Sequence, residues 1–306
     1  MTHPAPGSMT RASSRSLRDG STRFGITLPP TPPSSASEPD TDDETPAAAD
    51  LLLRATHVVF DFDGPVCSLF ATGENGTGSV APVIARDFRQ RLGKDHSQVL
   101  KMLDTEGVSK EDPHALYQAL VRLHRRSGND ETHELVDNMR AWLDEAEEKA
   151  VVDNAFPTPG AHQLLNVLHE RGYQLAIASN NSEAAIRSYL VRHELDGFFR
   201  EGLVRGRPRE AWLMKPHPHT PALVRAIWDT APSSASHHYV MIGDSVADVK
   251  ASSAQGVRFG FIGYHRTAKQ LALLRKESGA KAPMVTDLVR LTDEIVAQPS
   301  RVRLTA

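Results

Sequence analysis

The sequence contains a single cysteine, Cys67, so no disulfide bond can form within the chain. It also lacks any run of about 18 consecutive apolar residues, which is the length that a membrane-spanning helix needs. Basic residues are not in excess, because the formal net charge is -3 at pH 7, and this balance argues against a protein that binds the phosphate backbone of nucleic acids. The arginines near the N-terminus are not followed by the apolar stretch of a secretory signal. These absences predict a soluble, cytoplasmic protein whose partners include neither a membrane nor a nucleic acid.

The first fifty residues are poor in apolar side chains and hold eight of the 20 prolines of the chain, among many serines and threonines. Such a composition cannot bury enough apolar surface to fold alone, so we predict that residues 1–50 form a disordered leader. Its charge changes from scattered arginines to an acidic stretch, and an interaction tail is an alternative to a merely solvated segment. We expect ordered structure to begin near Leu51, and Met9 is a second candidate for the start of the chain.

Four short and nearly continuous apolar segments alternate with helical patterns in the rest of the chain. They span His57–Gly64, Tyr173–Ser179, His238–Asp244 and Arg258–Gly263. Strands without polar alternation are typical of a parallel sheet that helices cover on both faces. The sequence therefore predicts an α/β fold with a doubly wound parallel sheet.

More than a hundred residues separate the first of these segments from the second, far more than one crossover helix needs. Apolar residues recur there at steps of three and four, which is the pattern of amphipathic helices. They are Val83, Ile84, Phe88 and Leu92, then Leu116, Ala119, Leu120 and Leu123, then Leu135, Met139, Trp142 and Ala146. We therefore predict an inserted helical cap over residues 73–152 and a core domain over residues 51–72 and 153–306. The glycine-rich segment Gly73–Ser79 suits either a hinge or a plain surface loop.

Acidic residues follow two of the predicted strands, at the edge where ligands gather in a parallel sheet. Asp61 and Asp63 end the first strand two residues apart, which places both carboxylates on one side of it. Asp244 and Asp248 follow a later strand. Several carboxylates at one edge repel one another and raise one another's pKa, and a divalent cation such as Mg²⁺ relieves that repulsion. For Asp248 alone, near a helix start, capping is the alternative.

Two further clusters supply groups that suit a phosphate. Ser179 and Asn180 end the second strand, so a hydroxyl and backbone N–H groups lie at a helix start, where anions bind. Lys215 lies between an apolar residue and Pro216, which keeps it out of a helix. A lysine held in this way beside carboxylates neutralises charge, whereas a lone lysine is usually a surface residue.

The order of these four clusters resembles the haloacid dehalogenase-like hydrolases. The similar subgroup carries a helical cap after the first strand and includes proteins like phosphoglycolate phosphatase and β-phosphoglucomutase. The first motif is Asp61-Phe62-Asp63-Gly64, the second Ser179-Asn180, the third Lys215-Pro216 and the fourth Gly243-Asp244-Ser245-Val246-Ala247-Asp248. Each motif alone is weak evidence, but four in the order of the family at the ends of predicted strands are strong evidence. The segment from Gly279 to Leu291 also looks like the last strand and helix of the family.

The resemblance implies a phosphatase that acts on a small phosphorylated metabolite. Asp61 would attack phosphorus and form an aspartyl-phosphate, and Asp63 would protonate the leaving oxygen and then activate water. The dehalogenases of the family lack the second aspartate, so Asp63 favours phosphate chemistry. A phosphomutase of the same family and a catalytically impaired protein that binds a phosphorylated ligand or a regulatory partner both stay open.

The remaining roles that the resemblance implies concern the phosphate and the metal. Ser179 and the Asn180 amide would hold the phosphoryl oxygens, and Lys215 would neutralise the intermediate. Asp61, the Asp63 carbonyl and Asp244 would hold Mg²⁺. Asp248 would be a ligand or act through water.

One position departs from the family pattern, in which the residue after the first motif is usually threonine or valine. Here it is Pro65, which has no N–H to offer a phosphate and restricts the loop. Other polar residues receive no role from the sequence. His96, His114, His124 and His133 lack metal-ligand spacing, and Arg205, Arg207 and Arg209 fit a solvated loop better than an anion-steering patch. For Cys67 we expect a small buried thiol.

Overall fold

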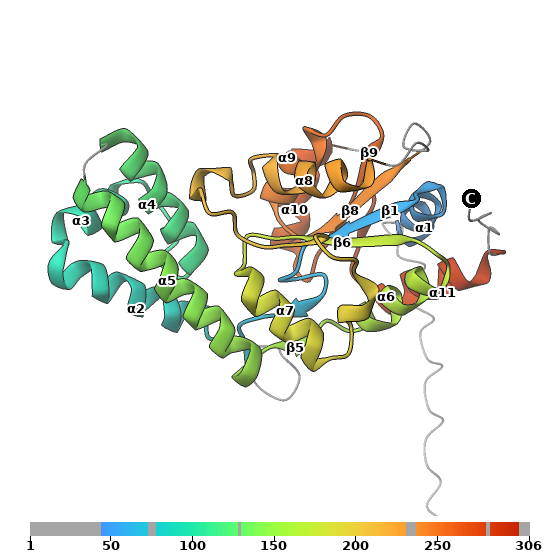
Figure 1. Ribbon diagram of the computed structural model, residues 1–306, viewed down its shortest axis with the longest axis horizontal. Helices are drawn as coiled ribbons and strands as arrows, with labels where there is room; N and C mark the ends of the chain where they lie inside the picture. Colours follow the sequence, from blue (N-terminus) through green and yellow to red (C-terminus); the bar gives the residue numbers. More distant parts are fainter. Residues whose placement is uncertain (1–43, 73–77, 128–129, 231–236, 280–281, 300–306) are drawn as a thin grey trace, which may run out of the picture. The chain divides into compact units, whose positions relative to one another are not determined.

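The computed structural model describes residues 44–72, 78–127, 130–230, 237–279 and 282–299. Their main feature is a six-stranded sheet with the order β10-β9-β8-β1-β6-β7, in which every neighbouring pair is parallel (Figure 1). The strands are β1 (His57–Phe60), β6 (Gln174–Ala178), β7 (Val204–Arg205), β8 (Tyr239–Gly243), β9 (Phe259–Tyr264) and β10 (Met284–Val285). The predicted α/β class and the parallel sheet are confirmed.

The central strand β1 sets the position of the functional edge. Its last residue, Phe60, lies opposite Ile177 of β6 and Ile242 of β8. The three strands therefore end at nearly the same level, and the residues that follow them meet at one edge. The strand order also changes direction at β1, because β6 lies on one side of it and β8 on the other. Such a switch point is where α/β sheets bind ligands.

Helices cover both faces of the sheet, and the alternation of side chains along β1 shows this. Val58 and Phe60 pack into one apolar cluster with residues of α1, α6, α7 and α11, whereas Val59 packs into another with residues of α8, α9 and α10. The first group is α1 (Thr45–Arg54), α6 (Ala161–Glu170), α7 (Glu183–Arg192) and α11 (Leu288–Ala297). The second is α8 (His219–Trp228), α9 (Val246–Ser253) and α10 (Ala268–Ser278). Burial on both faces explains why the strands are apolar without interruption.

The insert after β1 is helical, as predicted. It contains α2 (Ala81–Asp95), α3 (Ser97–Thr105), α4 (Pro113–Ser127) and α5 (Asp130–Asp153). Most of the predicted apolar stripe is buried, including Phe88, Leu92 and Leu120, while Val83 is exposed. Ala211 and Met214 of the core extend the same apolar cluster.

Short elements complete the described chain. Two pairs of antiparallel strands flank the insert, namely β2 (Cys67–Ser68) with β5 (Phe156–Pro157) and β3 (Ala71–Thr72) with β4 (Gly78–Ser79). Two single turns of 3₁₀-helix are η1 (Asp196–Phe198) and η2 (Ala211–Leu213). Cys67 is buried, as we expected. Most of the proposed hinge, residues 73–77, lies outside the described residues.

The predicted start of ordered structure near Leu51 is wrong, because α1 begins at Thr45. Pro46 lies in the first turn, where a missing N–H breaks no helical hydrogen bond. Ala48 and Leu52 then bury against the core beside α11. The proline that suggested disorder therefore belongs to the beginning of a helix. Residues 1–43 of the predicted leader lie outside the described residues.

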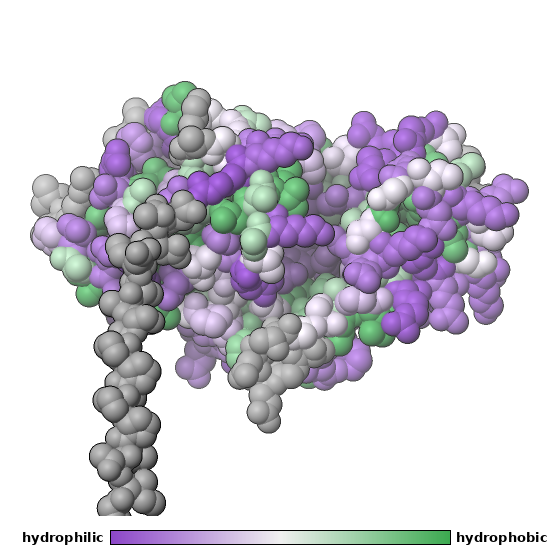
Figure 2. Space-filling model, turned by 180° about the vertical axis from the view of Figure 1, so that it is seen from behind, coloured by the Kyte–Doolittle hydropathy of each residue, from purple (hydrophilic) through white to green (hydrophobic). Residues whose placement is uncertain are grey.

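The surface of the described part is mainly hydrophilic in the view of Figure 2, with hydrophobic side chains in small areas between the polar ones. Among the described residues, no helix has both the length and the apolar character required to cross a membrane.

Candidate active site

Asp61 and Asp63 leave the end of β1 in a tight loop. Asp61 is 8% exposed, and its Oδ1 accepts a hydrogen bond of 2.7 Å from the backbone N–H of Phe62. Asp63 Oδ1 accepts one of 3.0 Å from the N–H of Leu69. Gly64 follows with a φ of 113°, and a Cβ atom there would lie 2.3 Å from Asp244 Oδ2. Glycine is therefore required for both its conformation and the close approach of the two acidic loops.

Hydrogen bonds of its neighbours close the loop that contains Pro65. The carbonyl of Phe62 accepts from the N–H groups of Val66 and Cys67, both at 3.2 Å, and Gly64 N–H donates to the Cys67 carbonyl at 2.7 Å. Thr158 Oγ1 donates to the Gly64 carbonyl at 2.6 Å. The loop is therefore closed by backbone and side-chain bonds of Phe62, Gly64 and Thr158, with proline at position 65.

Asp248 and Ser245 cap helix α9 after the end of β8. Asp248 Oδ2 accepts from the backbone N–H of Ser245 at 3.0 Å and from its hydroxyl at 2.7 Å, while the N–H of Asp248 donates to the hydroxyl oxygen at 3.3 Å. Such a reciprocal pair stabilises a helix start. The spacing Ser-x-x-Asp in the fourth motif is its sequence signature. The capping alternative that we considered for Asp248 is therefore correct, although the residue also lies in the acidic cluster.

Lys215 is almost completely buried and bridges two of the acids. Its Nζ lies 2.9 Å from Asp61 Oδ1 and 2.5 Å from Asp248 Oδ1. Burial alone would lower the pKa of Lys215, but the charges of Asp248 and Asp61 outweigh it and raise that pKa. The Asn180 side chain clamps the Lys215 backbone, because it donates to the carbonyl at 2.9 Å and accepts from the N–H at 2.8 Å. The lysine is thus held as a cation in the site.

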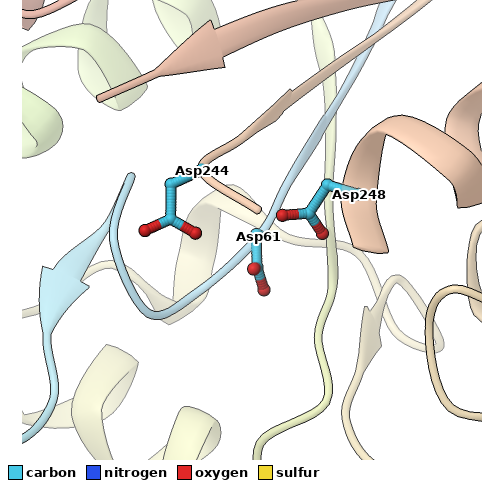
Figure 3. A group of neighbouring side chains, drawn as sticks. All are labelled: Asp61, Asp244 and Asp248. Carbon is cyan, nitrogen blue, oxygen red and sulfur yellow. The ribbon is translucent and has the colours of Figure 1, made fainter. Parts of the chain in front are cut away.

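Asp61, Asp244 and Asp248 form the one group among the described residues whose carboxylate, imidazole or thiol atoms could hold a metal ion. One oxygen of each lies within 4.8 Å of the others, and Figure 3 shows them arriving from two strand ends and a helix start. Burial and then the charge of Asp248 raise the pKa of Asp61 to about 6. Burial and then Asp61 and Asp248 raise the pKa of Asp244 well above its usual value. This excess of negative charge on hard oxygen atoms fits a divalent cation such as Mg²⁺.

The loop after β6 holds Ser179, Asn180 and Asn181 beside Lys215. Ser179 is fully buried, and its hydroxyl donates to Asn181 Oδ1 at 2.8 Å. Because the side chain of Asn180 is committed to the backbone of Lys215, any contact of Asn180 with a phosphate would use its backbone N–H. We call residues 179–182 the phosphate loop from here on.

The predicted residues converge on one cavity of about 280 Å³. Asp61, Asp63, Ser179, Asn180, Lys215 and Asp244 line it, together with Asp112, His114, Ala115, Gln118, Asn181, Ser245, Ala247 and Arg266. Asp248 is fully buried behind Lys215. The cap contributes Asp112, His114, Ala115 and Gln118, whose positions in α4 or just before it carry no motif that could have revealed them.

Two interpretations of basic residues need correction. We expected Arg207 to lie on a solvated loop, but it is 5% exposed and its guanidinium lies 2.5 Å from Glu147 Oε1. We gave His114 no role, but it lines the cavity, and its Nε2 lies 2.5 Å from the same carboxylate oxygen. Glu147 belongs to α5 and is fully buried. These contacts join helices of the cap to a loop of the core, far apart in sequence, so no local spacing predicts them.

Known proteins were compared with this sequence and structure. A family model described as haloacid dehalogenase-like hydrolase matches residues 55–256. A search of curated proteins found no match. Among solved structures, a predicted phosphoglycolate phosphatase of Lactobacillus delbrueckii subsp. bulgaricus is similar, with 17% identity and a TM-score of 0.51 over 79% of this chain and 99% of the other. A predicted phosphatase of Clostridium acetobutylicum has 17% identity and a TM-score of 0.50 over 79% and 98%. At this identity the two structures support the fold.

Proposed function

The chain belongs to the haloacid dehalogenase-like hydrolases, and from this premise we propose that it is a Mg²⁺-dependent phosphatase of small phosphorylated metabolites. The observation that carries the proposal is the cavity in which Asp61, Asp63 and Lys215 lie beside Asp244. A volume of about 280 Å³ lies just below the range for drug-sized ligand pockets, about 300–1,000 Å³. It suits a phosphoryl group with a leaving group of a few heavy atoms.

In the first step an oxygen of the Asp61 carboxylate attacks phosphorus. The new bond makes an aspartyl-phosphate, the bond from phosphorus to the ester oxygen breaks, and a proton from Asp63 passes to the departing oxygen. Burial raises the pKa of Asp63, which favours the protonated form that this step needs. The Lys215 ammonium, 2.9 Å from Asp61 Oδ1, favours the ionised form of the nucleophile.

In the second step water attacks the phosphorus of the aspartyl-phosphate. Asp63, now ionised, accepts a proton from the water, the bond from phosphorus to the Asp61 oxygen breaks, and inorganic phosphate leaves. Ser179 and the backbone N–H of Asn180 bind the phosphoryl oxygens in both steps. The N–H of Ser182 does not, because it donates to Glu147. Positioned charges of this kind supply most of the rate enhancement in phosphoryl transfer.

Asp61, the backbone carbonyl of Asp63 and Asp244 would hold the Mg²⁺ ion. Bound there, it would neutralise charge on the phosphoryl oxygens. Both oxygens of Asp248 already accept hydrogen bonds from the protein, which favours an indirect role for Asp248 through Lys215 or through water.

The test is release of phosphate from phenyl phosphate by the purified full-length protein, with Mg²⁺ and with EDTA, beside the Asp61→Asn and Asp63→Asn variants. We expect hydrolysis that needs Mg²⁺ and that both substitutions abolish. The matched control is Asp293→Asn, which changes an exposed aspartate on α11 and should hydrolyse like the wild type. Activity that persists in Asp61→Asn would refute the proposal, and isomerisation of a sugar phosphate without release of phosphate would identify a mutase instead.

A further inference from the structure

Glu147 of the cap reaches into the core and ends at the phosphate loop. The residue is fully buried, and its Oε2 accepts a hydrogen bond of 2.5 Å from the backbone N–H of Ser182. Its Oε1 lies 2.5 Å from His114 Nε2 and 2.5 Å from the Arg207 guanidinium, and it accepts from Asn181 Nδ2 at 3.4 Å. Four donors from three segments therefore surround one carboxylate. Two of these donors belong to the phosphate loop.

Arg207 connects the Glu147 carboxylate to backbone carbonyl groups of the phosphate loop. Its backbone N–H donates to the Asn181 carbonyl at 2.7 Å, and its Nε donates to the Asn180 carbonyl at 3.0 Å. The guanidinium also lies 3.2 Å from Asp144 of α5 and over the Tyr117 ring of α4. Arg207 is therefore a cross-link between two cap helices and the residues that would bind phosphate.

His114 is the member of this network that lines the cavity. Its side chain is 21% exposed. Burial lowers its pKa, but the hydrogen bond and the charge of Glu147 outweigh that effect, so the pKa of His114 is raised. A protonated imidazole has two N–H groups. Nε2 is directed at Glu147, so the Nδ1–H of the protonated ring is the second donor that His114 can offer.

The other polar cap residues of the cavity have structural contacts of their own. Asp112 Oδ1 accepts from the N–H of Ala115 at 2.9 Å at the beginning of α4. Gln118 Nε2 donates to the carbonyl of Lys215 at 3.3 Å. Among the described cap residues that line the cavity, His114 is thus the one that can carry positive charge.

We propose that His114 determines substrate specificity by donating a hydrogen bond to an oxygen of the leaving group, and that Glu147 and Arg207 are the positioning residues that hold it there. This inference rests on the proposed function and narrows its substrate class. The substrates are short phosphoesters that carry a hydroxyl or carboxylate oxygen a few bonds from the ester. Because the network also contacts the phosphate loop, the position of the leaving group is coupled to that of the phosphoryl group.

The first experiment compares kcat/KM for two kinds of probe. Glycerol 3-phosphate and 3-phosphoglycerate carry acceptor oxygens on the leaving group, whereas phenyl phosphate carries none. We take whichever of the two acceptor probes the wild type hydrolyses with the higher kcat/KM. We expect His114→Ala to lower that kcat/KM by about 10- to 100-fold, which is the range for a lost hydrogen bond to a charged group. For phenyl phosphate the loss should stay below about threefold. Equal losses for both kinds of probe, or no loss for either, would overturn the inference.

The positioning residues are tested with Glu147→Gln beside Glu148→Gln, which removes the same charge from an exposed neighbour on α5. We expect Glu147→Gln to lower kcat/KM for both kinds of probe, because Glu147 also contacts the phosphate loop, but by a larger factor for the probes with acceptor oxygens. Glu148→Gln should leave both kinds of probe unchanged. The imidazole resonances of His114 in NMR spectra should titrate at lower pH in Glu147→Gln and at the wild-type pH in Glu148→Gln. An unchanged His114 titration in Glu147→Gln would refute the positioning role even if activity falls.

A binding measurement separates this inference from the proposed function. In the Asp61→Asn background, calorimetry measures the binding of glycerol 3-phosphate, 3-phosphoglycerate and inorganic phosphate. We expect His114→Ala to lower the affinity for the two esters by about 10-fold or more and to leave the affinity for inorganic phosphate unchanged. If the wild-type protein hydrolyses no probe, the proposed function fails, and this selective binding then decides the inference alone. Binding of the esters that is unaffected or absent would overturn it.

Discussion

Two clusters of buried charge meet at the cavity, and they differ in how their charges balance. At the strand ends, Asp61, Asp244 and Asp248 lie together, and Lys215 pairs with Asp61 and Asp248. The pKa of Asp244 is nevertheless raised well above its usual value, by burial and then by Asp61 and Asp248. At the contact of cap and core, Glu147 faces Arg207 and His114, which outweigh its burial and lower its pKa.

This difference in charge balance distinguishes a cluster that can bind a ligand from a network that stabilises the contact between cap and core. The strand-end cluster carries more negative charge than its own residues neutralise, so a divalent cation can complete it. The network around Glu147 pairs its carboxylate with cations and N–H donors of the protein. Such a network fixes geometry and requires no ligand.

The largest effect should follow a change in the unbalanced cluster. We expect Asp61→Asn to lower the rate of phosphate release on the order of 10⁴-fold or more, because the attacking oxygen is lost. Its melting temperature should be equal to or above that of the wild type, since the substitution removes repulsion among buried carboxylates. Calorimetry of both proteins without metal checks this. A clear fall in melting temperature would break the comparison.

The balanced network should respond in the opposite way. Glu147→Ala leaves the buried Arg207 without its closer carboxylate, so that Asp144 at 3.2 Å is the acidic partner that remains. Removal of one member of a buried pair costs about 3–5 kcal/mol. Urea unfolding measures this loss. The control is the exposed Glu148→Ala, whose free energy of unfolding should stay within about 0.5 kcal/mol of the wild-type value. The double variant Glu147→Leu with Arg207→Met should recover part of the loss. Equal unfolding free energies for Glu147→Ala and Glu148→Ala would contradict the assignment.

A smaller effect should follow a change at Gln270, which supports the strand-end cluster from α10. Its Nε2 donates to Asp244 Oδ2 at 3.0 Å and to the Asp244 carbonyl at 2.8 Å. Groups that orient a metal ligand typically account for about 10- to 100-fold in metal affinity. We expect Gln270→Ala to weaken Mg²⁺ binding in calorimetry by about that factor. Lys269→Ala, an exposed neighbour, should bind Mg²⁺ like the wild type.

The smallest effect concerns the pH dependence of stability. The pKa of His114 is raised above 6.5 in the folded protein, so its stabilising contribution is complete below about pH 6.5 and is lost as the pH rises through the folded value. The difference in unfolding free energy between the wild type and His114→Gln should therefore be larger at about pH 6 than at about pH 9. His133→Gln, which removes an exposed histidine of α5, is measured at the same two pH values as the control for the substitution itself.

The sequence predicted the strand-end cluster well because its parts are local. Each acid follows a recognisable apolar strand, and parallel strands bring their carboxyl ends to one edge. The cap network escaped prediction because its partners lie 33 and 60 residues apart in sequence. A histidine and a glutamate on amphipathic helices look like surface residues. The start of α1 was missed for a related reason, since Pro46 in a polar context gives no sign of the apolar contacts that Ala48 makes.

Cys67 offers a practical consequence for experiments on the cap. It is the one thiol of the chain and is completely buried, and burial, followed by the charges of Asp63 and Asp61, raises its pKa well above the usual value. A thiol of this kind reacts slowly with alkylating reagents. A second cysteine, placed at exposed Glu148, would therefore accept a fluorophore or spin label selectively while the native sequence around Asp61, the proposed nucleophile, stays intact. Changes in the surroundings of α5 could then be followed with this one label when substrate is added.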